Sequence, residues 1–187
     1  MQNDAAALGA TARAFHWATA ALVVPTIPAG LIMVRDGIPR GLQDALFLYH
    51  KNAGVLILIL VLARLFWRAR HAPPPLPAHL PRWQAMAATL NHVALYALLL
   101  VLPVTGYIRV RAGGFPIEVL DALGVPALVP RSEALATGAQ WIHWAAGLTV
   151  TAAVLMHLGA AAYHGLIRRD GIIGRIWPPV GPARAGR

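Results

Sequence analysis

Apolar residues gather into four long runs along the 187-residue chain, and the segments between the runs are richer in charged residues, Pro and Gly. The runs lie at residues 15–34, 49–67, 86–108 and 141–167. The hydrocarbon layer of a membrane is about 30 Å thick, so about 20 helical residues cross it. The pattern therefore predicts an all-α membrane protein, a four-transmembrane-helix bundle that forms one domain over residues 1–187.

Composition supports a membrane location. Hydrophobic residues make up 58% of the chain and charged residues 12%, with a mean hydropathy of +0.59, which is more apolar surface than a soluble domain of this size can bury. The first run follows Arg13 and resembles the start of a secretory signal peptide. It is longer than an apolar h-region and lacks a small-residue cleavage site, so we expect it to be a retained helix.

The distribution of charge predicts the orientation of the bundle. With four spans, both termini and the segment between the second and third spans lie on one side. That side carries ten of the sixteen basic residues: Arg13, Arg64, Arg68, Arg70, Arg82, Arg168, Arg169, Arg175, Arg184 and Arg187. The other side carries six, diluted by five acidic residues, and the positive-inside rule then places both termini in the cytoplasm. Because the basic residues flank the spans, we expect contacts with membrane lipid and no nucleic-acid partner.

Two further features limit the chemistry. The chain has no cysteine, which excludes disulfides, thiolate metal sites, iron–sulfur clusters and covalent c-type haem. Residues 109–140 hold too much Pro and Gly to span, so we expect either a lid or a loop with one short surface helix. Pro28 and Gly30 in the first run, and Pro103 and Gly106 in the third, are expected to mark kinks and close packing.

Histidines inside the runs are candidate functional residues, because an imidazole in hydrocarbon is costly without a partner. His143 and His157 are fourteen residues apart, which places them about 40° apart around a helix and about 21 Å apart along it. His50 begins the second run on the outer side, and His16 begins the first run on the cytoplasmic side. The expected pairs are His50 with His143 and His16 with His157, although depth alone would let His164 pair with His16 almost as well.

Two neutral imidazoles from facing helices, with no carboxylate or thiolate nearby, suit the axial positions of a haem iron, whereas zinc would need more protein ligands. Small residues follow each candidate ligand by four positions and leave room for a flat ring: Ala20, Gly54, Gly147 and Ala161. A histidine-lined metal transporter is an alternative. Since no Asp or Glu lies inside the runs, a dication would find little charge compensation there.

Six motifs together resemble the bacterial cytochrome b561 family of four-helix di-haem membrane cytochromes. They are FHW at 15–17, YHKNAG at 49–54, RLFWR at 64–68, LPRWQ at 80–84, NHVALYALLLVLPVTG at 91–106 and HWAAGLTVTAAVLMH at 143–157. The resemblance covers nearly the whole chain. It implies two b-type haems with the axial ligands His16, His50, His143 and His157, and it favours His157 over His164.

The remaining histidines of the runs have alternative interpretations. His164 either contacts a quinone or carries protons near the cytoplasmic haem, or it is an interfacial side chain that reaches toward water. His92 is either a hydrogen-bonding neighbour of a ligand or a packing residue.

Basic residues close to the ligands are candidates to hold the haem propionates, which are anionic. Arg13 and Lys51 are the main candidates, and Arg64 and Arg109 are the next. For each of them, orientation of the bundle and contact with lipid headgroups is the alternative role.

Two axial histidines leave the iron no open position for oxygen, so the expected chemistry is one-electron transfer. We expect a cytochrome that carries electrons across the bacterial cytoplasmic (inner) membrane between an outer donor and ubiquinone. The resembled family includes superoxide oxidases, which makes superoxide a candidate donor that outer cations such as Lys51 would attract. The alternative is a membrane-anchoring cytochrome b subunit that accepts electrons from a periplasmic redox partner, a dehydrogenase or hydrogenase.

Overall fold

The computed structural model describes residues 7–77 and 80–178, so Arg184 and Arg187 of the predicted cytoplasmic side lie outside the described residues. The described chain is helical and contains no strand. Its helices are α1 (Ala10–Ile32), α2 (Arg40–Arg70), α3 (Arg82–Ala112), α4 (Glu118–Ala122) and α5 (Glu133–Ala162), followed by a π-helical turn, η1 (Tyr163–Arg168), and a 3-10 turn, η2 (Ile173–Arg175).

Four of these helices are long and apolar enough to cross a membrane: Ala10–Ile32, Arg40–Arg70, Arg82–Ala112 and Glu133–Arg168. The predicted all-α fold with four spans is confirmed. The helices extend beyond the apolar runs because polar helical turns outside the hydrocarbon leave no hydropathy signal. At the start of α5, for example, the hydroxyl of Ser132 accepts a hydrogen bond from the amide of Leu135 at 3.3 Å and caps the helix.

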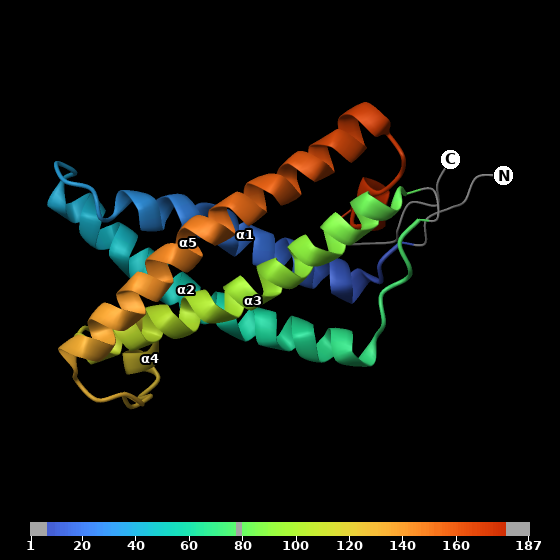
Figure 1. Ribbon diagram of the computed structural model, residues 1–187. Coiled ribbons are helices and arrows are strands. Elements are labelled where there is room, and N and C mark those ends of the chain that lie inside the picture. Colours follow the sequence, from blue (N-terminus) through green and yellow to red (C-terminus); the bar gives the residue numbers. More distant parts are fainter. Residues whose placement is uncertain (1–6, 78–79, 179–187) are drawn as a thin grey trace.

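The spans pack unevenly. α1 packs closely on α2, α2 on α3 and α3 on α5, whereas the backbone of α5 stands farther from those of α1 and α2, and the helices spread apart in the ribbon view (Figure 1). The core is thin and lies at the middle of the bundle around Val23, Ile57 and Val61. Most other apolar side chains of the spans face outward, as expected for helices surrounded by lipid.

The bundle has two different ends. The end that carries the turn between α1 and α2 together with α4 is called the α4 end here. At the opposite end, called the terminal end, the segment after α5 returns to the start of α1 (Figure 1). There the indole nitrogen of Trp17 donates to the carbonyl of Ile176 at 2.9 Å, and the Arg175 guanidinium donates to the carbonyl of Pro74 at 2.8 Å. The prediction that the terminal end faces the cytoplasm stays a prediction.

Candidate functional site

At the α4 end, His50 of α2 faces His143 of α5. Their ring centroids are 6.0 Å apart and their planes are inclined by 76°. Both side chains are half-buried. The structure thus brings together the first of the two histidine pairs that the spacing predicts.

Backbone carbonyls orient both of these imidazoles. His50 Nδ1 lies 3.1 Å from the carbonyl oxygen of Thr26, and His143 Nδ1 lies 2.9 Å from that of Leu102. The hydroxyl of Thr105 is also 3.2 Å from His143 Nδ1. A carbonyl can only accept, so Nδ1 carries the proton and Nε2 keeps its lone pair, which is the usual arrangement of a metal-binding histidine.

Glycines make these contacts with the backbone possible. Gly30 and Gly106 each follow the accepting carbonyl by four residues, and therefore lie one helical turn beyond it on the same face. A Cβ added to Gly30 would lie 2.7 Å from His50 Cε1, and one added to Gly106 would lie 3.1 Å from His143 Cε1. From the apolar pattern, both glycines were predicted only to mark kinks and close packing. A sequence signal for this role does exist, because in each of two helices the glycine lies two or three residues after a proline.

At the terminal end, His16 of α1 faces His157 of α5 with ring centroids 6.1 Å apart. Side chains surround this pair. The ring of His92 lies 5.3 Å from that of His157. The Arg64 guanidinium has one nitrogen 3.5 Å from His16 Nδ1 and lies 5.2 Å from the centre of the Tyr96 ring. Within the described residues, neither His16 nor His157 hydrogen-bonds to a backbone carbonyl.

Both pairs fit two axial ligands of one metal ion. A metal that bonds two opposed imidazole nitrogens at about 2.0 Å each separates the ring centroids by roughly 6 Å, as both pairs do. An added Cβ at Gly54 or Gly147 would meet no heavy atom within 4 Å, so there is space beside the imidazoles for a flat ring. No group of three or more His, Cys, Asp or Glu side chains that could hold a metal occurs in residues 7–77 and 80–178.

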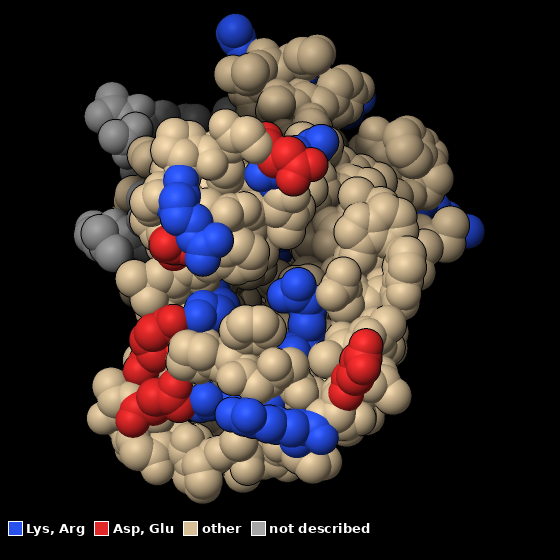
Figure 2. All heavy atoms as spheres, turned by 90° about the vertical axis from the view of Figure 1, so that its left-hand side faces the viewer, with Lys and Arg blue, Asp and Glu red and all other residues tan. Residues whose placement is uncertain are grey.

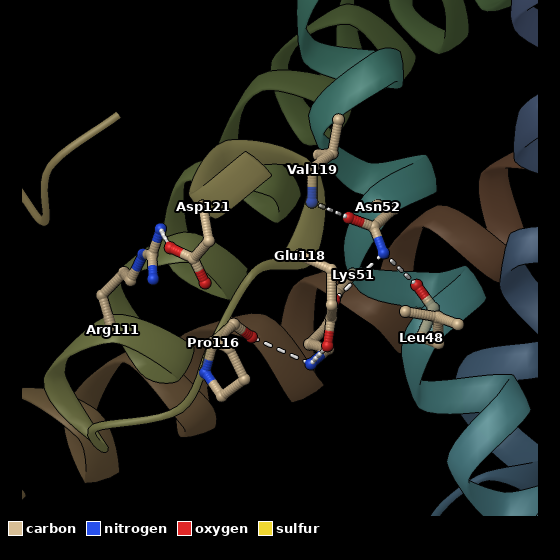
Figure 3. Close-up of polar contacts among 8 residues, drawn as sticks. All are labelled: Leu48, Lys51, Asn52, Arg111, Pro116, Glu118, Val119 and Asp121. Carbon is tan, nitrogen blue, oxygen red and sulfur yellow. Dashed lines mark hydrogen bonds and ion pairs between the residues drawn. The ribbon is translucent and has the colours of Figure 1, made fainter. Parts of the chain in front are cut away.

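Lys51 is held by the loop after α3. Its ammonium donates to Glu118 at 2.5 Å and to the carbonyl of Pro116 at 2.9 Å. The neighbouring Asn52 accepts from the amide of Val119 at 2.9 Å and donates to Glu118 at 3.0 Å (Figure 3). Burial alone would raise the pKa of Glu118, but the bonds from Lys51 and Asn52 outweigh it, and the pKa is lowered. The loop thus contains one short helix, tied to the bundle through α2.

A second ion pair joins α4 to the end of α3. The Arg111 guanidinium lies 2.6 Å from the Asp121 carboxylate (Figure 3), and this hydrogen bond lowers the pKa of Asp121. Arg109 donates instead to the side-chain oxygen of Gln140 at 3.2 Å. Figure 2 looks onto this face and shows basic and acidic side chains interspersed around a central hollow.

The other predicted residues lie at the terminal end. Arg13, three residues before His16, is 1% exposed. His164 lies in η1, and its Nδ1 is 2.6 Å from the carboxylate of Asp170. Both side chains of this pair are nearly buried. Asp170 was not predicted as a site residue, because it follows the last apolar run and nothing in the pattern shows that the chain folds back there.

Comparison with known proteins identifies relatives over the same region. A family model described as prokaryotic cytochrome b561 matches residues 7–179. The Escherichia coli (strain K12) protein named cytochrome b561 homolog 2 is 32% identical over 169 residues, which cover 90% of this chain and 89% of that protein. Cytochrome b561 homolog 1 of the same organism is 33% identical over 168 residues, 87% of this chain and 92% of that protein. A Yersinia pestis protein named probable superoxide oxidase CybB is 31% identical over 94 residues, 49% of this chain and 51% of that protein.

Proposed function

The chain belongs to the prokaryotic cytochrome b561 family of membrane electron-transfer proteins, and we propose that it binds two b-type haems and carries electrons across the bacterial cytoplasmic membrane. The α4 end is the proposed outer face, where a donor is oxidised. The terminal end is the proposed cytoplasmic face, where ubiquinone is reduced.

One observation carries this proposal: two opposed imidazole pairs of nearly equal spacing, 6.0 Å and 6.1 Å, lie at opposite ends of the bundle. α5 supplies one histidine to each pair, and α1 and α2 supply the others. Haem b would supply a one-electron carrier at each pair, and if both histidines of a pair held the iron, no position would be left open for oxygen. The carriers would therefore pass electrons without binding oxygen at the metal.

The residues of the chain divide the remaining tasks. The carbonyls of Thr26 and Leu102 hold His50 and His143 in the tautomer that presents Nε2. The hydrocarbon around the spans excludes water from the path between the two pairs. Arg13, which is buried and lies three residues before His16 in α1, is the proposed partner of an anionic haem propionate.

His164 and Asp170 are the proposed proton donors for the acceptor. Reduction of a quinone to a quinol takes up protons together with electrons, so the acceptor site needs a titratable group. The carboxylate of Asp170 lies 2.6 Å from His164 Nδ1. It would accept a hydrogen bond from Nδ1–H and stabilise the imidazolium form of His164, whose Nε2–H would give its proton to the quinone. Each proton lost from this dyad would be replaced from the aqueous side of the terminal end.

Superoxide is the proposed donor. Two superoxide anions would each lose one electron and leave as oxygen, which together supplies the two electrons needed to form one quinol. The name of the Yersinia pestis relative, probable superoxide oxidase, supports this choice, and the similarity to it covers about half of each chain. At the proposed outer face Arg109 forms no ion pair with a carboxylate among the described residues and donates to Gln140, whereas Lys51 is paired with Glu118.

The test uses the purified, haem-loaded protein in lipid vesicles that contain ubiquinone. Superoxide generated outside should reduce the haem absorption bands and then form quinol. Asp170→Asn should slow quinol formation and leave haem reduction by the donor unchanged. Haem bands that stay oxidised with superoxide but are reduced by a copurifying dehydrogenase or hydrogenase would replace superoxide as donor and favour the membrane-anchoring subunit.

A further inference from the structure

We propose that Arg64 raises the reduction potential of the haem at the terminal end above that of the haem at the α4 end, and so fixes the direction of electron flow. This inference rests on the proposed function, because it requires a haem at each histidine pair. The two histidine pairs have nearly the same spacing and do not by themselves indicate which haem receives the electron last. The inference about Arg64 answers that question.

The first step is the contact between Arg64 and a ligand. One guanidinium nitrogen lies 3.5 Å from His16 Nδ1. Arginine is a donor only, and a His16 that binds a metal through Nε2 carries its own proton on Nδ1. The guanidinium would therefore act on the ring through its charge, which persists at any ordinary pH. A fixed positive charge beside an axial imidazole opposes the oxidised state, which carries one more positive charge, and therefore favours the reduced state.

The second step is that this charge is not compensated. Arg64 forms no ion pair with a carboxylate in the part of the chain that the structure describes. Its guanidinium lies over the ring of Tyr96, which Arg68 also approaches at 5.8 Å. Arg64 is half-buried, so water and salt screen its field less than they screen a surface charge.

The third step is the contrast with the α4 end. Carbonyls accept the Nδ1 protons of His50 and His143, which makes each imidazole a stronger electron donor and favours the oxidised metal. Among residues 7–77 and 80–178 no guanidinium makes a hydrogen bond to either ring. Arg109 is close enough to act on both rings through its charge, but it donates to Gln140 and contacts neither of them.

The overall charges differ in the same sense. At the α4 end, six basic residues face five acidic ones: Arg35, Arg40, Lys51, Arg109, Arg111 and Arg131 against Asp36, Asp44, Glu118, Asp121 and Glu133. Among the described residues of the terminal end, eight arginines face one acid: Arg13, Arg64, Arg68, Arg70, Arg82, Arg168, Arg169 and Arg175 against Asp170. Both the ligand contacts and the surrounding charge therefore make the terminal-end haem the easier one to reduce.

The experiment is a spectroscopic redox titration of the haem-loaded protein and three variants. Arg64→Gln should lower the reduction potential of the higher-potential haem and leave that of the other haem unchanged. We expect at least a tenfold change in its oxidised-to-reduced ratio at a fixed potential, which is about 59 mV for one electron. Arg64→Lys keeps a positive charge, so the reduction potential of the higher-potential haem should stay close to its wild-type value. Arg68→Gln, one turn along the same helix and more exposed, is the matched control and should shift the component much less.

A second comparison does not depend on whether Arg64→Gln binds haem. In His143→Ala only the terminal-end haem should remain, and in His157→Ala only the α4-end haem. The haem that remains in His143→Ala should have a higher reduction potential than the haem that remains in His157→Ala. The reverse order, or an Arg64→Gln variant that leaves the higher component in place, would overturn the inference. A wild-type protein with fewer than two haems would instead overturn the proposed function on which it rests.

Discussion

The two ends of the bundle hold their histidine pairs by different means. At the α4 end, backbone carbonyls of Thr26 and Leu102 orient both rings. At the terminal end, the neighbours of His16 and His157 are the side chains of Arg64 and His92. A carbonyl fixes the orientation of the imidazole, and this contact persists whatever side chain the accepting residue carries. A side-chain neighbour also sets the charge beside the imidazole, and a substitution can change that charge. The two pairs therefore share a spacing and differ in how each can be tuned.

The ends also differ in how they are closed. α4 is tied down by the ion pairs Lys51–Glu118 and Arg111–Asp121. The terminal end is closed by hydrogen bonds to carbonyls, for example from Trp17 to Ile176. The terminal end also has the His164–Asp170 pair, so salt should weaken contacts at both ends, and the carbonyl contacts of the terminal end least.

Removal of one ligand from each end gives the largest expected effect. His143→Ala should cost the α4-end haem and leave the other, and His157→Ala should do the opposite, because each pair is complete without the residues of the other. Haem content per polypeptide should fall by half in each variant, measured from the reduced absorption spectrum. Unchanged helix content by circular dichroism is the control. Loss of both haems in a variant that remains folded would show that the ends are not independent.

Replacement of Gly30, which contacts the ring of His50, by alanine should weaken haem binding at the α4 end and leave the terminal end unchanged. In Gly30→Ala the added Cβ would lie 2.7 Å from His50 Cε1, so the ring must move away from the carbonyl of Thr26. Loss of such a supporting contact typically costs about 10–100-fold in metal affinity. We expect a loss in this range for the α4-end haem, measured by haem transfer to an acceptor protein.

Two further glycine variants sharpen that result. Gly106→Ala should act in the same direction but less, because its added Cβ would lie 3.1 Å from His143. Gly138→Ala is the matched control, since a Cβ at Gly138 on α5 meets nothing within 4 Å. Equal losses in Gly30→Ala and Gly138→Ala would remove the proposed role of the glycine contact.

The smallest expected effect concerns the attachment of α4. Glu118→Gln should loosen residues 113–125 while the terminal end stays unchanged, at a cost of about 0.2–1 kcal/mol, as for other partly exposed ion pairs. Because the pKa of Glu118 is lowered in the folded protein, its contribution is complete above the ordinary pKa of a glutamate and is lost as the pH falls through the folded value. Hydrogen exchange of this loop should differ between wild type and variant at pH 7 and converge in acid. A difference that persists in acid would contradict the assignment.

The apolar pattern predicted much of the fold, because membrane spans are defined by local hydropathy. The four spans followed from it, but the polar turns at the start of α2 and α5 did not. The fourteen-residue spacing placed His143 and His157 on one face of a helix, and the structure brings each opposite a histidine of another helix. Ligation by these residues stays a prediction.

Other parts of the site depend on contacts that a linear pattern does not contain. Nothing in the sequence shows that the imidazole of His50 on α2 contacts the carbonyl of Thr26 on α1, one helical turn before Gly30. Lys51 was predicted to hold a propionate or attract an anion, and in the structure its ammonium contacts Glu118, sixty-seven residues later. The partner of His164 likewise depends on a change of chain direction after η1.

The most direct test of the central claim is the number of haems bound by the wild-type protein. The purified polypeptide, saturated with haem b and freed of excess, should show two haems per chain, each low-spin with two axial imidazoles in its electron paramagnetic resonance spectrum. One haem per chain, or an iron with any other axial ligand, would contradict the claim that each end of the bundle clamps one haem between paired histidines.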